Sequence, residues 1–304
     1  MIVGGGAAGL SAALVLGRAR RRILVVDSGQ QSNLSAHGIG GLLGFDGRSP
    51  AELYAAGRAE LRAYPSVEVR DGTVVDAIAA EGGFTVELAD GARVNTKRIV
   101  LATGMEYRPP ALAGLSELWG GSVFHCPFCH GWEVREQPLA VCANGERGVH
   151  SALLLRGWSD DVVLLTNGPA DLNAEQVEKL SAAGVSVDDR AIASLAGADG
   201  QLTDVVFADG ARLPRRGLLV ATTLHQRSSL AARLGAEFNP PGPVAVDALK
   251  TDPFCRTTVP GVFAAGDVSA QMSQVAAAAA AGSLAGAAVM QTLMAEDFGL
   301  PIRN

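Results

Sequence analysis

The segment Ile2–Asp27, IVGGGAAGLSAALVLGRARRRILVVD, decides the fold. An apolar strand-like start runs into Gly4, Gly6 and Gly9, a helical pattern follows, and a second apolar strand ends at Asp27. The first glycine permits a tight turn, the second lets backbone approach a pyrophosphate, and the third allows the helix to pack closely. The closing acid is placed to accept hydrogen bonds from a ribose. The segment therefore predicts a βαβ unit that binds a dinucleotide.

The same order of strand, helix and strand returns at residues 138–168, PLAVCANGERGVHSALLLRGWSDDVVLLTNG. Strand-like stretches with Asp-Gly turns, at 67–79 and 201–223, are typical of antiparallel layers. A late strand, TTVPGVFAAGD at 257–267, ends in Gly-Asp before an Ala-rich helix, and so presents backbone amides and one carboxylate at a sheet edge. The order predicts an α/β fold with parallel sheets, in which one nucleotide-binding plan occurs twice.

Composition narrows the classes of partner. The 304 residues, 48% of them hydrophobic, suffice for about two domains. A net charge of −6 leaves no basic surface to neutralise phosphates, so we expect no nucleic-acid partner. No signal-peptide pattern opens the sequence, and we expect a cytoplasmic protein. Residues 275–290 are apolar but shorter than the ~20 residues that span a bilayer, so we expect a packed helix and no membrane partner.

The segment HCPFCHGWE, His125–Glu133, carries the redox or metal chemistry. Structural zinc usually takes two separated ligand pairs, whereas here all candidates crowd together, so we expect no metal. A CxxC at a helix start brings the sulfurs of Cys126 and Cys129 within disulfide reach, and the helix dipole is expected to lower the pKa of the first. Histidine takes a proton from a thiol at neutral pH, which predicts a base at His130. His125 either assists or holds the loop by a hydrogen bond.

Together with LATG at 101–104 and TTVPGVFAAGD, the first glycine motif resembles the FAD domain of the low-molecular-weight thioredoxin reductases. The resemblance covers essentially the whole chain. It implies two Rossmann-like domains of the thioredoxin reductase type, the second inserted into the first: an FAD domain made of 1–113 and 229–304, and an NAD(P)H-domain-like domain, 114–228, that carries the CxxC. It also implies a homodimer.

The resemblance further assigns roles to single residues. Cys126 would be the outward interchange thiol and Cys129 the one that faces the flavin. Asp267 would bind the ribityl or pyrophosphate part of FAD, and Gln274 with Val275 would lie near the isoalloxazine. The full set of residues expected at FAD is Gly4, Gly6, Gly9, Asp27, Thr103, Gly104, Gly266, Asp267, Gln274 and Val275.

The second nucleotide motif departs from the family pattern. Ala143 stands at the tight-turn position, and Arg147 stands where a small residue is usual. The family places a His-Arg-Arg cluster for the NADPH 2′-phosphate where this chain has TNG, 166–168. Either hydride delivery from NADPH has been lost, or the site has diverged and uses Arg147, Arg156 or Arg190 instead.

CPFCHG together with TNG most resembles the dithiol oxidases that close the disulfides of natural products such as gliotoxin and holomycin. The resemblance implies an FAD-dependent oxidase in which a small-molecule dithiol reduces the CxxC pair and O2 is reduced to H2O2. His130 would stand in for the aspartate acid/base of the reductases. Two alternatives stay open: an NADPH-dependent or other donor-dependent reductase acting on a protein disulfide, and a flavin-binding regulatory protein without turnover.

Overall fold

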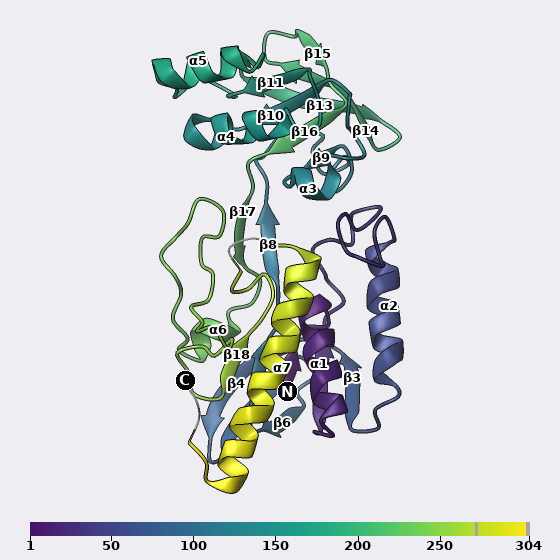
Figure 1. Cartoon of the computed structure of the whole chain (residues 1–304), viewed down its shortest axis with the longest axis vertical. Coiled ribbons are helices and arrows are strands. Elements are labelled where there is room, and N and C mark those ends of the chain that lie inside the picture. The colour runs from purple at the N-terminus through teal and green to yellow at the C-terminus, as the bar shows by residue number, and fades with distance from the viewer. Residues whose placement is uncertain (271–272, 302–304) are drawn as a thin grey trace. The chain divides into compact units, whose positions relative to one another are not determined.

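The structure, a computed structural model, describes residues 1–270 and 273–301 and divides them into two compact units (Figure 1). The chain passes from the first unit to the second at Tyr107/Arg108 and returns at Thr222/Thr223. An earlier segment, Ser35–Arg48, also belongs to the second unit, although the sequence predicted a continuous first part up to residue 113. The domain limits 1–113, 114–228 and 229–304 themselves stay a prediction.

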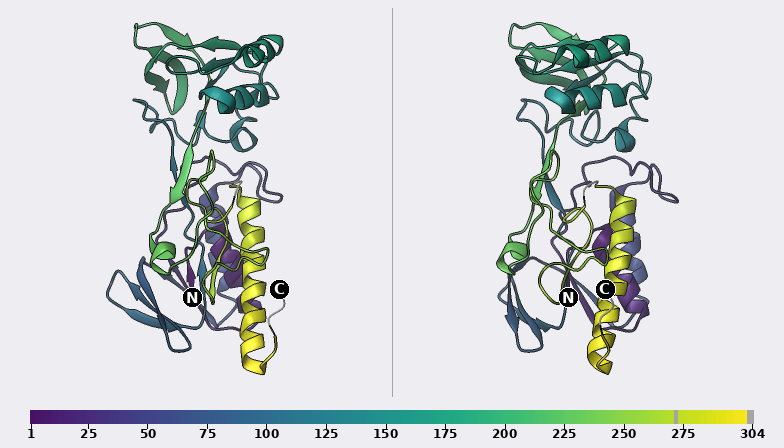
Figure 2. Two further views of the ribbon diagram at one scale, coloured as in Figure 1. Left: turned by 90° about the vertical axis from the view of Figure 1, so that its left-hand side faces the viewer. Right: turned by 60° about the vertical axis from the view of Figure 1, so that its left-hand side comes forward.

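The first unit is built on a five-stranded parallel sheet in the order β18-β7-β1-β2-β3. Helices α1, α2 and α7 bury Ala and Leu side chains against one face, and an antiparallel sheet β4-β5-β6 with the short α6 covers the other (Figures 1 and 2). The strands are β1 Ile2–Val3, β2 Ile23–Asp27, β3 Val67–Asp71, β4 Val74–Ala80, β5 Gly83–Leu88, β6 Arg93–Thr96, β7 Ile99–Leu101 and β18 Val262–Ala264, with β8 Met105–Arg108 paired to β17 Thr223–Gln226. The helices are α1 Ala7–Arg18, α2 Pro50–Leu61, α6 Leu230–Arg233 and α7 Val275–Phe298.

The second unit repeats the plan, with a parallel sheet in the order β12-β11-β10-β16-β9. Helices α4 and α5 pack on one face, and an antiparallel sheet β13-β14-β15 packs on the other. The α/β fold class with two nucleotide-type units is therefore confirmed. The elements are β9 Val123–Phe124, α3 Pro127–His130, β10 Leu139–Cys142, α4 Gly145–Leu155, β11 Val162–Leu165, α5 Ala174–Ala182, β12 Ser186–Asp188, β13 Ile192–Ala198, β14 Gln201–Phe207, β15 Arg212–Pro214 and β16 Gly217–Val220.

Helix α7 is longer than the apolar stretch 275–290 suggested. Its 24 residues make it long and apolar enough, by length and composition alone, to cross a membrane, so the length argument from the sequence was wrong. Packing decides its role: a Cβ at Gly282 would lie 2.0 Å from the carbonyl oxygen of Ala8, and one at Gly286 would lie 3.0 Å from that of Ala12. α7 therefore lies directly on α1 as the core helix of a soluble domain.

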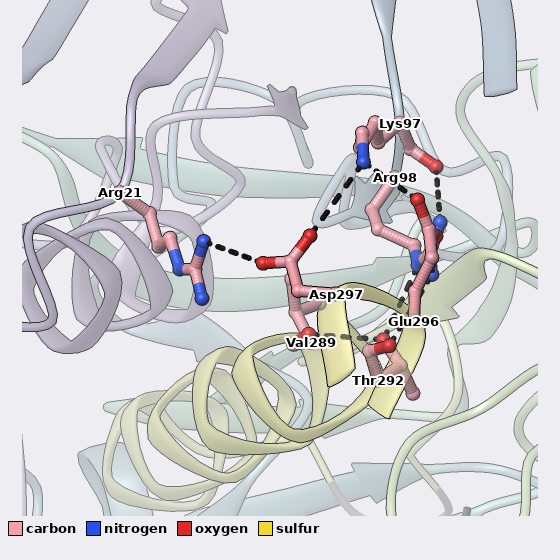
Figure 3. A network of polar contacts seen from close by, with 7 residues as sticks. All are labelled: Arg21, Lys97, Arg98, Val289, Thr292, Glu296 and Asp297. Atoms are coloured by element: carbon pink, nitrogen blue, oxygen red, sulfur yellow. Dashed lines mark hydrogen bonds and ion pairs between the residues drawn. The ribbon is translucent and has the colours of Figure 1, made fainter. Parts of the chain in front are cut away.

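A polar network fixes the last turns of α7 (Figure 3). Arg21 pairs with Asp297 at 3.3 Å, while Lys97 and Arg98 both pair with Glu296, at 2.6 and 2.7 Å. Arg98 also donates to the hydroxyl of Thr292 at 3.2 Å. Single exposed ion pairs contribute little, but these come from two other segments of the first unit and so set where the long helix ends.

The close approach of α7 to α1 predicts the effect of one methyl group. Gly282→Ala should lower the free energy of unfolding by about 1–3 kcal/mol, because the new Cβ overlaps backbone atoms that cannot move aside. Ser283→Ala, next along the helix and exposed, is the matched control and should not lower it. Denaturant unfolding followed by circular dichroism measures both, and equal stability of the two variants would contradict the packing described.

Candidate functional site

The loop between β1 and α1 keeps a nucleotide-binding geometry. Gly4 has φ +107°, and a Cβ there would lie 2.2 Å from the carbonyl oxygen of Ala102. A Cβ at Gly9 would lie 1.9 Å from the carbonyl oxygen of Gly4. Gly6 is the N-cap of α1, gives no side-chain cap, and is followed by no acidic residue in the first turn. The first backbone amides of α1 thus lack a side-chain acceptor, which suits a pyrophosphate.

Asp27 ends β2 beside this loop. Its carboxylate pairs with Arg58 at 2.5 Å and accepts hydrogen bonds from the amide of Gly29 and the side chain of Gln31, both at 3.1 Å. Burial alone would raise the pKa of Asp27, but the hydrogen bond to Arg58 and the amides of Gly29 and Gly5 hold it below its usual value. The carboxylate is therefore ionised at the sheet edge. Arg58 and Gln31 were not predicted.

A second carboxylate, Asp267, follows β18 at the same edge. Gly266 takes φ +85° to turn the chain, and Asp267 accepts a hydrogen bond from the hydroxyl of Tyr107 at 2.9 Å. Burial raises the pKa of Asp267, although Tyr107, Ser273 and Arg227 counteract it. A buried carboxyl with a raised pKa can form hydrogen bonds with the hydroxyl groups of a polyhydroxyl chain.

Sheet order brings the remaining predicted cofactor residues to this edge. β7 lies between β18 and β1, and Thr103 and Gly104 follow it after Ala102. Gly104 has φ +66° and open space where a Cβ would stand. Gln274 is the N-cap of α7, and Val275 is the first residue of that helix. The donors, acceptors and uncapped helix of the first unit fit FAD, while the contact made by each residue stays a prediction.

The corresponding loop of the second unit is closed differently. Asn144 caps α4: its side-chain oxygen accepts hydrogen bonds from the amides of Gly145 at 2.8 Å and Asp171 at 2.9 Å, and its side-chain nitrogen donates to Pro169 at 2.9 Å. The Asp171 carboxylate lies 3.6 Å from the Cβ position of Gly145, and Glu146 adds a negative charge to the first turn. These groups cap the start of α4 and bring negative charge to it, which disfavours a pyrophosphate there.

Residues 166–168 at the end of β11 include no arginine, and Arg190, whose segment pairs with them, forms an exposed ion pair with Asp188. The Thr166 hydroxyl donates to the carbonyl of Gly168 at 2.7 Å, and the Asn167 side chain accepts from the amide of Ile192 at 2.7 Å. The three arginines that could substitute have protein partners: Arg147 donates to the carbonyl of Thr222, Arg156 binds Ser159 and Asp160, and Arg190 pairs with Asp188.

The CxxC forms a single helical turn. Cys126 is the N-cap of α3, and its sulfur lies 2.6 Å from that of Cys129. The hydrogen bond from the Cys129 thiol, followed by the amides of Cys129 and Phe128, lowers the pKa of Cys126 to about 7 against the effect of burial. The predicted lowering is found, but α3 has only four residues, so local hydrogen bonds cause it rather than a long helix dipole.

The two flanking histidines are both held neutral near neutral pH. Burial lowers the pKa of His130, and His37 adds to this, while Glu133 and the carbonyl groups of Gly120 and Cys126 oppose it. Both ring nitrogens of His130 are buried without a hydrogen bond in the structure, and the ring stacks on Phe124. A neutral imidazole can accept a proton.

His125, the first histidine of the segment, is a weak base. Burial, with smaller contributions from the charges of His130 and Arg147, lowers its pKa to about 4. Its ring stacks on Trp119 at 5.8 Å between centroids. A base that weak holds no proton at neutral pH, which favours a structural role in the loop.

A further histidine of the second unit, His37, was not predicted at this site. His37, in the segment Ser35–Arg48, lies beside Gly121, since its Nε2 is 3.8 Å from the Cβ position of that glycine. Within residues 1–270 and 273–301, no group of three or more His, Cys, Asp or Glu side chains could hold a metal ion.

Comparison with known proteins agrees with this geometry. Residues 1–282 match the family described as pyridine nucleotide-disulphide oxidoreductase. The relative named thioredoxin reductase tcpT, from Claviceps purpurea (strain 20.1), is 34% identical over 306 residues, which cover 97% of this chain and 94% of that protein.

Two solved structures are equally similar in shape. An oxidoreductase from Agrobacterium tumefaciens is 39% identical, with a TM-score of 0.91 over 96% of this chain and 97% of its own. HlmI is 38% identical, with a TM-score of 0.91 over 98% and 93%. The expected thioredoxin-reductase-like fold and the FAD cofactor are confirmed. The chain belongs to the pyridine nucleotide-disulphide oxidoreductase family, as a thioredoxin-reductase-like flavoenzyme.

Proposed function

We propose that this flavoenzyme is a dithiol oxidase, which forms an intramolecular disulfide in a small-molecule dithiol and reduces O2 to H2O2. One contrast carries the proposal: the N-terminus of α1 is uncapped, whereas that of α4 is capped by Asn144 and faced by Asp171. Two similar helices thus differ in whether they can receive a pyrophosphate. The chain keeps its FAD-type site and lacks the features of a hydride-donor site.

The end of β11 supports the same conclusion. Recognition of a 2′-phosphate needs a guanidinium that can turn toward it, and recognition of a ribose needs an acid at the strand end. Thr166 and Asn167 offer neither, and both are engaged with backbone groups. Without NADPH, electrons enter from thiols.

The residues of the CxxC turn suit that direction. His130 accepts a proton from one substrate thiol, and the thiolate attacks the Sγ of Cys126 in the oxidised pair, which releases the thiolate of Cys129. The second substrate thiol, once deprotonated, attacks the first substrate sulfur, closes the product disulfide and releases Cys126. A pKa of about 7 makes Cys126 a good leaving group. When bound, FAD would supply the two-electron acceptor that returns the reduced pair to its disulfide, with O2 as the final oxidant.

Exposed aromatic groups beside the pair favour a small, partly apolar substrate. The side chain of Phe128, between the cysteines, is 58% exposed and meets Trp158 edge-on at 5.5 Å. Trp132 is 66% exposed, with Arg135 over its ring at 3.8 Å. Such rings bind flat apolar molecules well. We further propose a cytoplasmic homodimer, for which exposed Leu284 and Met294 of α7 offer apolar surface.

The runner-up is a reductase that passes electrons outward to a protein disulfide. The name of the fungal relative, thioredoxin reductase, favours it. It requires an electron donor, and the capped start of α4 and the lack of an arginine among residues 166–168 disfavour NADPH in that role.

The source of electrons separates the two functions. Under anaerobic conditions, dithiothreitol should bleach the bound flavin, whereas NADPH should not, because no group of the second unit is arranged to hold it. With air, dithiothreitol should give one H2O2 per disulfide formed. Rapid bleaching by NADPH and none by dithiothreitol would refute the oxidase.

A matched variant tests whether the pair carries the electrons. Cys129→Ser should abolish oxygen consumption and keep the flavin spectrum, because the first unit binds FAD on its own residues. Unchanged oxygen consumption in this variant would instead support a flavin protein without CxxC turnover.

The low pKa of Cys126 gives a pH dependence. In reduced enzyme, alkylation of Cys126 by iodoacetamide should rise with pH and reach half its maximal rate at about pH 7. In Cys129→Ala the main stabilising hydrogen bond is gone, so the midpoint should move up toward about 8.5, the ordinary cysteine value. Mass spectrometry of the labelled peptide measures both, and an unmoved midpoint would show that Cys129 does not stabilise the thiolate. Cys142 and Cys255 are buried with raised pKa values and serve as the internal background.

A further inference from the structure

Two aspartates lie side by side where β2 and β3 end. The register of this parallel pair places Asp27 directly beside Asp71. The side chain of Asp27 is only 5% exposed, whereas that of Asp71 is 82% exposed. Like charges on directly neighbouring strands destabilise a sheet, and a buried carboxylate needs hydrogen-bond donors and an opposite charge. This edge of the sheet therefore needs a cation.

Arg58, on α2, supplies that cation to both aspartates. Its Nη2 lies 2.5 Å from Oδ2 of Asp27, and its Nη1 lies 2.7 Å from Oδ1 of Asp71. A planar guanidinium can hold two carboxylates in a fixed geometry, which the single ammonium group of lysine cannot do. Arg58 thus joins α2 to the ends of two neighbouring strands.

The oxygen that Arg58 holds also lies against the glycine loop. A Cβ at Gly5 would lie 2.4 Å from Oδ2 of Asp27. The dinucleotide motif leaves this position open, so the contact with Asp27 is what requires a glycine here. The other oxygen, Oδ1, accepts hydrogen bonds from the amide of Gly29 and the side chain of Gln31, both at 3.1 Å. Arg58 and these donors together fix the rotation of the carboxylate.

The same contacts keep the Asp27 carboxylate charged. Burial would raise its pKa, and the hydrogen bond from Arg58 is the strongest effect that lowers it. In the described part of the chain, the other ionisable groups that face Asp27 are Asp71, which Arg58 pairs, and Tyr54 of α2, whose pKa of about 12 leaves it neutral. Without Arg58, Asp27 would therefore bind a proton at a higher pH.

We propose that Arg58 is a positioning residue of the FAD site, which holds the Asp27 carboxylate against the glycine loop so that its oxygens can accept hydrogen bonds from the ribose of the cofactor. A carboxylate at the end of the second strand is the group that the motif assigns to the ribose. Arg58 acts through Asp27. Because FAD binding is common to an oxidase and a reductase, the proposal does not depend on the dithiol oxidase function.

The test is the rate at which FAD leaves the holoenzyme on dilution, followed by the gain in flavin fluorescence. At about pH 8, Arg58→Gln should release FAD about tenfold faster than wild type, because a hydrogen bond between charged groups is lost. The difference should grow as the pH falls toward about 5.5, because Asp27 takes up a proton first in the variant. Arg58→Lys, which keeps the charge but not the fork, should give an intermediate rate. Arg62→Gln, at the exposed C-cap of the same helix, is the matched control and should keep the wild-type rate.

Two further variants separate positioning from a merely structural tether. Asp27→Asn should itself release FAD faster than wild type, and Arg58→Gln in that background should add nothing, since no carboxylate is left to hold. Asp71→Asn should leave the rate unchanged, because Arg58 keeps its bond to Asp27. A tether between α2 and the two strands would instead be weakened by Asp71→Asn and by Arg58→Gln alike.

Four results would overturn the proposal: a wild-type release rate in Arg58→Gln or in Asp27→Asn, a full additional effect of Arg58→Gln in the Asp27→Asn background, an Asp71→Asn rate as high as that of Arg58→Gln, or a defect of Arg58→Gln that does not change with pH. None of them bears on whether dithiothreitol or NADPH reduces the flavin, so the oxidase function stands or falls separately.

Discussion

Backbone amides at the start of a helix need a hydrogen-bond acceptor. The two units differ in what supplies that acceptor at the start of α1 and of α4. Gly6 gives α1 no side-chain cap, so its amides are left for an anion that the protein itself does not supply. Asn144 caps α4 and also holds the backbone of Asp171 over it. The same supersecondary unit therefore begins with an uncapped helix in one place and a side-chain-capped helix in the other, which supports the proposed loss of the second nucleotide site.

Strand order turns this local difference into a functional one. In the first unit the ends of β18, β7, β1 and β2 lie side by side, so that Asp267 and Asp27 flank the uncapped helix. The pKa of Asp267 is raised and that of Asp27 is lowered. The same sheet edge therefore carries both a carboxyl that can donate a hydrogen bond and a carboxylate that stays negatively charged. In the second unit, the polar side chains at the equivalent sheet edge form hydrogen bonds mainly with the backbone of neighbouring loops.

Much of the fold and part of the site could be predicted from the sequence, and the division between the two has a physical reason. The positions of Gly4, Gly9 and Asp27 could be predicted because a tight turn, a closely packed helix and the end of a strand depend on the local sequence. Arg58, Asp171 and His37 gave no such signal, since each reaches its place through tertiary packing of a distant segment. The helix-start argument for Cys126 gave the right direction for its pKa, but the hydrogen bond from the Cys129 thiol contributes more than the first amides of α3, a helix of one turn.

The proposed direction of electron flow rests on what surrounds the sulfurs rather than on the sulfurs themselves. A CxxC pair exchanges with thiols and with disulfides by the same chemistry. A pair that a hydride donor keeps reduced needs an acid for the departing thiol, whereas a pair that the flavin keeps oxidised needs a base for the arriving one. Burial lowers the pKa of His130 and so favours its neutral form. A neutral imidazole can accept the proton of an arriving thiol, but it is not the acid that a departing thiolate needs. A closed α4 and a neutral His130 are thus two separate features of the second unit that favour the same direction, from substrate thiol to flavin.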